Sequence, residues 1–376
     1  MRLPGQRRPS AEARFLTLAL RGEEPAGSPA LSEVAREVRD WSRVALLSAQ
    51  HGVSPWLLRS ISYADLNAVI PNASLAAIRR QARACVLKTL SLTQALQEAL
   101  LALGTEGIPI AVLKGPAIAE RYYPDPSLRP YRDIDLLVPL EAHRRVFDVC
   151  ARLGYIVAED RGGVSAAASG TCESPFEATF VHQECEVKLE IHYDHLQTGL
   201  RPQAMDDVWQ RSEPWAFHGA SARVLALNDL FLFLCVHLNK HGFGGLIWFK
   251  DLDLIVRKHG DQLDWRWLDE AARREGVRTS LTYALRLLAK LLNTPLPADA
   301  AALADVTGVS IVHRLLWREE NVLNLGVGRW RRAFQFVPRD GLRGALPSVL
   351  VMGRRPDKLW ALTRRLLPRG HRSKPL

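Results

Sequence analysis

Cysteine is scarce in this chain and is not arranged for metal or disulfide chemistry. The 376 residues include five cysteines, Cys85, Cys150, Cys172, Cys185 and Cys235. None of them forms a Cys-x-x-Cys pair, and their number is odd. The sequence therefore predicts neither a cysteine-rich zinc site nor a disulfide framework. Scattered free cysteines are typical of a reducing compartment, and we predict a cytoplasmic protein.

Long apolar runs are also missing. Residues 230–236 form the most apolar stretch, far below the roughly 20 residues needed to span a bilayer. Residues 15–20 are apolar but too few, and lack a cleavage site, for a signal peptide. With 47% hydrophobic and 24% charged residues, the composition is that of a soluble globular protein with room for two or three domains.

Most of the chain carries little net charge. The total is +10, but 13 Lys and Arg against two Asp give residues 329–376 alone +11, which leaves about −1 for residues 1–328. The basic excess therefore belongs to a C-terminal tail, whose expected partners are a membrane surface, an acidic protein or a nucleic acid. Residues 359–367 fit a short basic amphipathic helix, which favours a peripheral location at a membrane.

Two aspartates at the start of an apolar run are the most informative feature of the sequence. Asp133 and Asp135 flank Ile134 and precede the apolar residues 136–138. Because side chains alternate along a strand, both carboxylates should point the same way, about 7 Å apart. Such a pair repels unless a cation lies between the two groups, and Mg²⁺ prefers oxygen ligands. The pair therefore predicts a divalent-metal site of the kind used in phosphoryl transfer.

A later segment, residues 186–192, offers a third carboxylate. Its apolar and polar residues alternate, which predicts a half-buried strand with one charged face. Glu190 lies in the middle of that face and is the expected third metal ligand. His192 follows on the same face, where it either contacts metal-bound phosphate or the acceptor, or is a hydrogen-bonded structural residue.

A phosphate-binding turn is predicted ahead of the two aspartates. Residues 108–113 read as a buried first strand, followed by Lys114, Gly115 and Pro116. Gly115 permits close approach of the backbone, and Pro116 suits the first position of a helix. A helix N-terminus attracts phosphate. Lys114 either adds a positive charge to that site or is a solvated lysine at the end of the strand.

Arg129 stands four residues before Asp133. Its guanidinium group could bind a phosphate through two hydrogen bonds, or orient Asp133 or Asp135 through an ion pair. The sequence alone leaves both alternatives open.

Two histidines mark a later helical region. His237 and His241 are four residues apart, so they share one face of a helix with Lys240 beside them. This spacing can bind zinc, but a metalloprotease needs Glu directly after the first His, where this chain has Leu238. We therefore expect His237, Lys240 and His241 to line a cleft and to meet the base or phosphate of a nucleotide. Asp251 is expected near the start of the next helix, where the helix dipole favours acids.

Together these motifs resemble the nucleotidyltransferase fold of the DNA polymerase beta type. The resemblance lies in a Gly after a strand, then a helix, then Asp-x-Asp on the next strand and an acid on a later strand. The sequence segments LKG, DIDLLV and LEIH, together with residues 237–242, resemble those of a bacterial group of uncharacterised nucleotidyltransferases. The resemblance covers about residues 10–300. The wider superfamily usually has Gly-Ser or Gly-Gly where this chain has Gly115 and Pro116, and that Ser normally helps to hold a triphosphate.

The resemblance implies a set of roles for the motif residues. Asp133, Asp135 and Glu190 would be the catalytic residues and would hold two Mg²⁺ ions, with Mn²⁺ as an alternative. The substrate would be an NTP, held at its phosphates by Lys114 and Gly115. The acceptor, a hydroxyl or phosphate group on another molecule, is not indicated by any residue.

The expected fold class is α+β, with a nucleotidyltransferase-like core of mixed sheet and helices between two helical regions. We divide the chain into an N-terminal helical region (1–104), the core (105–226), a C-terminal helical region (227–328) and the basic tail (329–376). Residues 31–50 have a helical pattern, and residues 75–103 have the pattern of one long helix. Residues 160–175, rich in Gly, Ser and Ala, form either a hairpin connection or a lid. The two helical regions are expected to wall the cleft.

Three functions are compatible with these features. The first is a metal-dependent nucleotidyltransferase in which Glu190 also helps to deprotonate the acceptor. The second is a catalytically weak module that binds a nucleotide or a partner, motivated by the missing Ser after Gly115. Against it, three unpaired acids on one surface would cost stability without helping packing. The third, nucleic-acid binding through the tail, has no supporting aromatic strand or helix-turn-helix pattern.

Overall fold

The structure of the protein is a computed structural model that describes residues 9–22, 29–158, 177–196, 202–305 and 322–323. The basic tail (329–376) and the segment 160–175 lie outside these residues, so the predictions made for them stay predictions. Across the described part of the chain, no helix combines the length and the apolar character that crossing a membrane requires.

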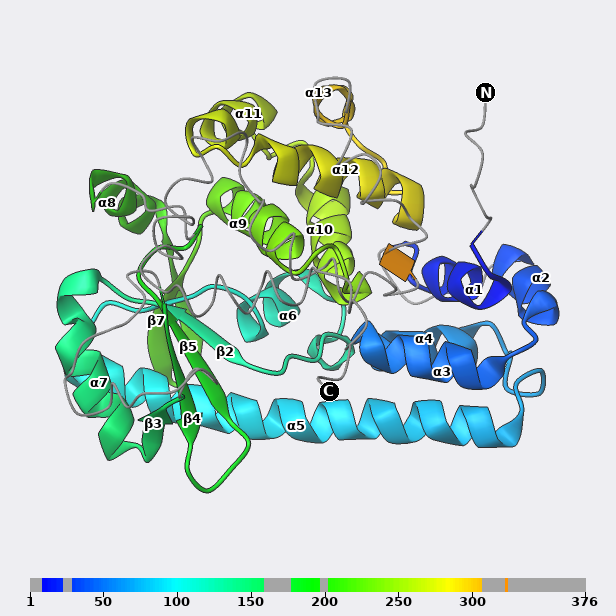
Figure 1. The fold of residues 1–376 in the computed structure, drawn as a ribbon, viewed down its shortest axis with the longest axis horizontal. Coiled ribbons are helices and arrows are strands. Elements are labelled where there is room, and N and C mark those ends of the chain that lie inside the picture. The colour runs from blue at the N-terminus through cyan, green and yellow to red at the C-terminus, as the bar shows by residue number, and fades with distance from the viewer. Residues whose placement is uncertain (1–8, 23–28, 159–176, 197–201, 306–321, 324–376) are drawn as a thin grey trace, which may run out of the picture.

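A mixed sheet lies at the left of the molecule in Figure 1. Within the described residues it has seven strands: β1 (Ala111–Val112), β2 (Ile134–Leu137), β3 (Tyr155–Val157), β4 (Glu177–His182), β5 (Lys188–His192), β6 (Glu213–Phe217) and β7 (Ala220–Val224). Their order across the sheet is β3-β4-β5-β2-β1-β7-β6. The pairs β2–β5 and β1–β7 are parallel and the other neighbours are antiparallel. This topology brings β2 and β5 side by side.

Five helices precede the sheet: α1 (Ala11–Ala19), α2 (Pro29–Glu37), α3 (Trp41–Gln50), α4 (Ser54–Tyr63) and α5 (Asn72–Thr105). The 34-residue α5 runs along the lower edge of the molecule in Figure 1. Near its start, Leu75 and Ile78 pack in the core of the N-terminal helices, whereas Leu92 and Leu96 near its end pack under the sheet. This helix therefore joins the N-terminal helices to the sheet.

Three further helices accompany the strands: α6 (Pro116–Tyr122), α7 (His143–Arg152) and α8 (Pro202–Arg211). Two 3₁₀ turns, η1 (Pro126–Leu128) and η2 (Leu140–Ala142), precede β2 and α7. The C-terminal helices are α9 (Leu227–Lys240), α10 (Leu246–His259), α11 (Trp265–Arg274), α12 (Arg278–Leu292) and α13 (Ala298–Leu303). The expected α+β fold class is confirmed.

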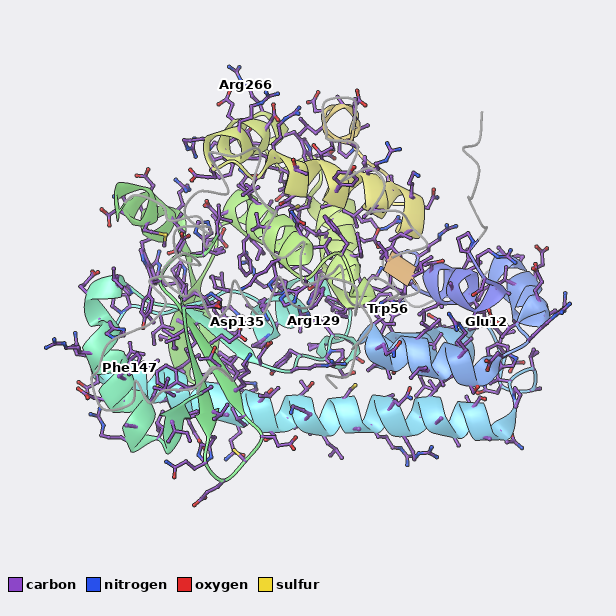
Figure 2. All side chains as sticks on the ribbon, in the orientation of Figure 1. Glu12, Trp56, Arg129, Asp135, Phe147 and Arg266 are labelled. Carbon is purple, nitrogen blue, oxygen red and sulfur yellow. The ribbon has the colours of Figure 1, made fainter. Side chains whose placement is uncertain are left out.

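The N-terminal and C-terminal helices share one hydrophobic core. Phe15 and Trp56 from the start of the chain belong to the same buried cluster as Phe231 and Leu285. Figure 2 shows Trp56 inside the N-terminal helices and Arg266 on the outer surface of α11, while Asp135 and Arg129 lie between α5 and the C-terminal helices. Two helical regions far apart in the sequence therefore pack against each other beside the sheet.

The structure refines one local prediction and shortens another. Residues 31–50 form two helices, α2 and α3, because the Asp40 carboxylate accepts a hydrogen bond from the Arg43 backbone N–H at 2.9 Å and so begins a new helix. The first strand is reduced to Ala111–Val112. Its ladder still continues through a hydrogen bond from the Leu113 N–H to the Asp135 carbonyl at 3.1 Å.

Candidate active site

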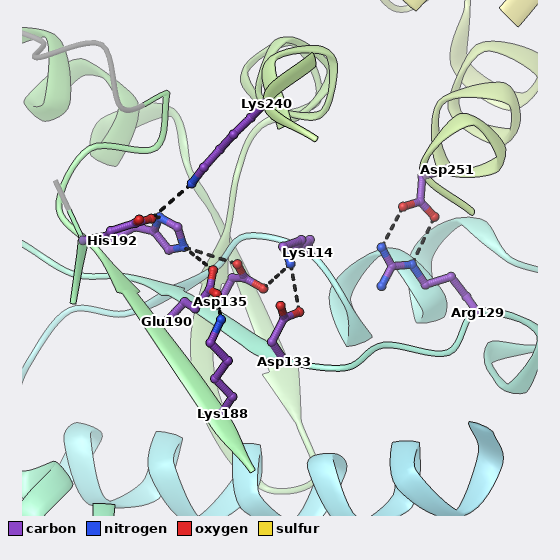
Figure 3. A network of polar contacts seen from close by, with 10 residues as sticks. Lys114, Arg129, Asp133, Asp135, Lys188, Glu190, His192, Lys240 and Asp251 are labelled. Atoms are coloured by element: carbon purple, nitrogen blue, oxygen red, sulfur yellow. Dashed lines mark hydrogen bonds and ion pairs between the residues drawn. The ribbon is translucent and has the colours of Figure 1, made fainter. Parts of the chain in front are cut away.

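The sheet places the predicted carboxylates on neighbouring strands. Asp135 on β2 stands directly opposite Glu190 on the parallel strand β5. His192 lies two residues after Glu190 on the same face, and its Nε2 is 3.2 Å from Asp135 Oδ1 and 3.9 Å from Glu190 Oε2. Figure 3 shows the three side chains converging at this point. The alternation of residues 186–192 predicted that Glu190 and His192 share one face of their strand. The pairing of this strand with β2 places Asp135 beside them.

Lys114 lies between the two aspartates. Its Nζ is 2.9 Å from Asp133 Oδ1 and 2.6 Å from Asp135 Oδ2 (Figure 3). Both aspartates therefore point to the same side, as the Asp-x-Asp spacing predicted. The lysine is 6% exposed, which rules out the alternative of a solvated strand-end residue. Burial opposes its charge, but Asp135 and Asp133 outweigh burial and raise the pKa of Lys114.

The other two carboxylates of the site also have amine partners. Glu190 pairs with Lys188, and Glu177 at the start of β4 pairs with Lys240 at 3.2 Å. The sequence argument that the acids would be unpaired is therefore wrong. Their charges are compensated by lysines, because β4, β5 and α9 bring amines to the site that the sequence pattern did not connect with them.

The pKa values of the two central carboxylates, Asp135 and Glu190, are shifted in opposite directions. Asp135 is 2% exposed, and burial, aided by the neighbouring Asp133 charge, outweighs Lys114 and raises its pKa. Burial also opposes the charge of Glu190, but the hydrogen bond from Lys188 and the Lys114 charge lower its pKa to about 2. Glu190 is thus a permanent carboxylate, suited to binding a cation and poorly suited to accepting a proton near neutral pH.

One group of side chains could hold a metal ion. Among the described residues, Asp135, Glu190 and His192 each offer a ligand atom, and these atoms lie within 4.8 Å of one another. Two oxygen donors and one imidazole fit a divalent cation such as Mn²⁺, and the carboxylates also suit Mg²⁺. Asp133, predicted as a metal ligand together with Asp135 and Glu190, contacts the Lys114 ammonium. Its metal role stays a prediction.

Arg129 has a partner that the sequence did not indicate. Its Nε and Nη2 donate to Oδ1 and Oδ2 of Asp251 at 3.1 and 2.7 Å, and Tyr123 Oη donates to Asp251 Oδ1 at 2.8 Å. The alternative in which Arg129 forms an ion pair with Asp133 or Asp135 is therefore wrong, because its guanidinium donates two bonds to Asp251. Phosphate binding by Arg129 stays a prediction. The expectation for Asp251 is also wrong, because α10 begins at Leu246 and buries the acid completely.

A pocket of about 830 Å³ opens above the carboxylates, which is within the usual size of a small-molecule site. One wall comes from the end of α3 and from α5, including His51 and Lys88, and the opposite wall from α9 and the start of α10. The pocket lining includes Lys114 but, among the described residues, does not include Gly115.

Gly115 instead shapes the turn. Its φ of +66° is in the left-handed region, and an added Cβ would lie 3.4 Å from the ring of Tyr131. Its assignment to the phosphate site stays a prediction that the pocket geometry does not support.

His237 and His241 form one aromatic wall of the pocket together with Trp248. The two imidazole centroids are 4.5 Å apart, and the His241 ring lies 4.7 Å from Trp248 with a 35° tilt. Burial and the nearby Lys114 charge lower the pKa of His237, while burial and Lys240 lower that of His241 to about 4. Both rings are therefore neutral near pH 7. The predicted shared face is confirmed, and its chemistry favours a flat neutral group over a phosphate.

These histidines should make stability pH-dependent. An unfolded histidine has a pKa near 6.5, whereas folded His241 has a pKa of about 4. Between these values the unfolded chain binds a proton that the folded chain does not, so stability is complete above pH 6.5 and falls as the pH drops through 4. We expect His241→Gln to reduce the slope in this window by up to about 1.4 kcal/mol per pH unit. Urea unfolding from pH 7 to 4 measures it.

The control for this experiment is the exposed His218, whose φ of +45° is tolerated by asparagine. His218→Asn should leave the wild-type slope in place. An unchanged slope in His241→Gln would show that this imidazole is not held neutral by the fold.

Four residues that line the pocket were not predicted as site residues: Lys188, Glu177, Trp248 and His195. Lys188 was visible as a member of the polar face of its strand, but its pairing with Glu190 was not. Glu177 lies in the pocket lining because it stands opposite His192 in the register of β4 with β5. His195 is buried, which lowers its pKa. No local pattern marks Glu177 or His195, because only the sheet register and the turn after β5 bring them to the pocket.

The mixed sheet, with Asp133 just before β2, Asp135 on it, and an acid and a histidine on the adjoining β5, is a nucleotidyltransferase-type core. The chain belongs to the family described as Uncharacterised nucleotidyltransferase, which matches residues 37–293. The match spans α3 to the end of α12 and so includes the sheet and both walls of the pocket. A comparison with curated proteins found no match.

Proposed function

We propose that the protein is a divalent-metal-dependent nucleotidyltransferase that moves a nucleoside monophosphate from an NTP to a hydroxyl or phosphate group of an acceptor. The observation that carries the proposal is the pairing of Asp135 with Glu190 on adjacent parallel strands, with His192 beside them at the floor of a ligand-sized pocket. Family membership supports it. A bound cation would neutralise charge on the transferred phosphoryl group and align the donor.

In this proposal each charged or metal-binding side chain of the site has its own role. Asp135 and Glu190 supply negative oxygen ligands, and His192 supplies a nitrogen. Because the pKa of Glu190 is only about 2, we assign it to binding the ion and not to taking a proton from the acceptor. Lys114 is held protonated by its two aspartates, so its amine is a charge and not a nucleophile. This disfavours a lysine-linked nucleotide intermediate.

The pocket walls favour one orientation of the donor. The neutral imidazoles and Trp248 offer flat faces for a nucleobase, on which stacking is worth about 1–3 kcal/mol per base. No described group hydrogen-bonds Nε2 of His237, which leaves it to meet a polar edge of the base. The lysines Lys88 and Lys188 line the other side and suit the phosphates. In this orientation Lys240, which pairs with Glu177, lies nearer the base than the phosphates.

A second candidate function is a module that binds a nucleotide or a partner without turnover. The amine partner found for each carboxylate favours it, since Lys114, Lys188 and Lys240 already compensate much of the acidic charge. Such a site could be stable without a metal ion, and a nucleotide would then bind through the pocket walls alone.

Calorimetric titration with ATP, GTP, CTP and UTP, with and without Mg²⁺ or Mn²⁺, separates the two. For the enzyme we expect metal-dependent binding of at least one NTP, which Asp135→Asn/Glu190→Gln reduces at least tenfold. Asp125→Asn, which removes an acid outside the pocket lining, is the matched control. Metal-independent binding that survives the double substitution would favour the binding module, and absence of binding by the wild type would contradict both.

A further inference from the structure

The two oxygens of Asp135 face different groups. Oδ2 is 2.6 Å from the Nζ of Lys114, whereas Oδ1 is 3.2 Å from the Nε2 of His192. In Figure 3 the ammonium and the Glu190–His192 pair lie on opposite sides of this carboxylate. Asp135 therefore bridges a fixed positive charge on one side and the only described group of metal-ligating side chains on the other.

The lysines at the site differ in how easily a metal ion could displace them. The Lys114 side chain is 7% exposed and contacts two carboxylates, while the Lys188 side chain is 42% exposed and contacts Glu190. An ion that approaches Glu190 can move Lys188 aside into solvent. Moving Lys114 would leave a buried ammonium without its partners, which is strongly unfavourable.

We propose that the Lys114 ammonium takes the place of one of the two metal ions of a nucleotidyl-transfer site, so that the chain binds a single divalent cation through Asp135, Glu190 and His192. This inference rests on the proposed function. In two-metal sites a carboxylate bridges two ions about 3.5–4 Å apart. Here Asp135 bridges an ammonium and one ion, and Asp133 serves to hold the ammonium.

The substitution keeps the charge pattern that phosphoryl transfer needs. An ammonium has three N–H donors, of which two point to Asp133 and Asp135, so one is left for a donor phosphate. This preserves the phosphate contact that the sequence predicted for Lys114. The imidazole in the ligand set favours Mn²⁺ over Mg²⁺, because Mg²⁺ strongly prefers oxygen ligands.

Counting bound Mn²⁺ tests the proposal directly. Titration of the full chain with Mn²⁺, with the free ion measured by its paramagnetic resonance signal, should show one tightly bound ion. Lys114→Gln removes the charge and shortens the side chain by one atom, and should bind two ions because Asp133 and Asp135 are then free to share a second cation. Lys114→Arg retains the charge and should bind one. Circular dichroism establishes that each variant is folded.

Lys188→Met is the matched control, since it also removes an amine that pairs with a carboxylate, and it should still bind one ion. Two ions bound by the wild type, or one ion bound by folded Lys114→Gln, would overturn the inference while leaving metal-dependent transfer intact. No Mn²⁺ bound by the wild type would overturn the inference together with the metal dependence in the proposed function. If Lys114→Gln does not fold, the count of the wild type decides between one ion and two.

Discussion

Asp135→Asn is expected to reduce nucleotidyl transfer by about 10³-fold without unfolding the protein. Asparagine keeps the shape of the side chain but removes the charge that would bind the cation beside Glu190 and His192. A metal ion contributes several kcal/mol to the stabilisation of a phosphoryl-transfer transition state, and about 4 kcal/mol corresponds to this factor. Transfer from an NTP labelled at the α-phosphate to acceptors in a cell extract measures the loss.

The stability of Asp135→Asn separates a functional role from a structural one. The folded state raises the pKa of Asp135, mainly through burial, so above the unfolded pKa of an aspartate its charge costs folding free energy. Removing the charge relieves this cost but leaves the buried Lys114 ammonium with Asp133 as its remaining acidic partner, so the protein should stay folded with a lower unfolding midpoint. Asp125→Asn should keep full transfer. Equal activity of Asp135→Asn and wild type would refute the assignment, as would a loss of activity that only follows unfolding.

Arg129→Met is expected to destabilise the protein by about 3–5 kcal/mol. The substitution leaves Asp251 as an unpaired charge at a position with no solvent exposure, and breaking a buried pair from one side has this cost. The bonds from Arg129 also tie the segment after η1, which leads into Asp133, to the helix α10. Urea unfolding followed by circular dichroism measures the change.

Two further variants make the Arg129 prediction specific. Arg132→Met changes an exposed arginine three residues later and should alter the unfolding free energy by less than about 0.5 kcal/mol. Arg129→Met/Asp251→Leu removes both charges and should recover most of the loss. Equal stability of Arg129→Met and Arg132→Met, or no recovery in the double variant, would show that the pair is not the source of the effect.

The relative orientation of the acids and the histidine at the base of the pocket could be predicted because it follows from local sequence patterns. Alternation along a strand places Asp133 and Asp135 on one side and Glu190 with His192 on one face, and no tertiary information is needed for either statement. The spacing of His237 and His241 likewise defines one face of a helix. These predictions hold in the structure.

The partners of these residues could not be predicted, because each lies on an element distant in the sequence. The amine of Lys240 meets Glu177 across 63 positions, and Arg129 meets Asp251 across 122. The sequence offered Arg129 only local partners, a phosphate at the site or the acids Asp133 and Asp135. Only the packing of α10 against the segment after η1 brings Asp251 to it.

The sequence by itself therefore determined which face of its strand or helix each candidate residue occupies, because strand and helix periodicity are local properties. The tertiary structure alone decided how the charges are compensated, because ion pairs depend on which elements become neighbours. The parallel pairing of β2 with β5 brings Asp135 to Glu190. The turn from β1 into α6 carries the Lys114 ammonium to the aspartates, and this contact is the basis on which we propose one cation in place of the expected two.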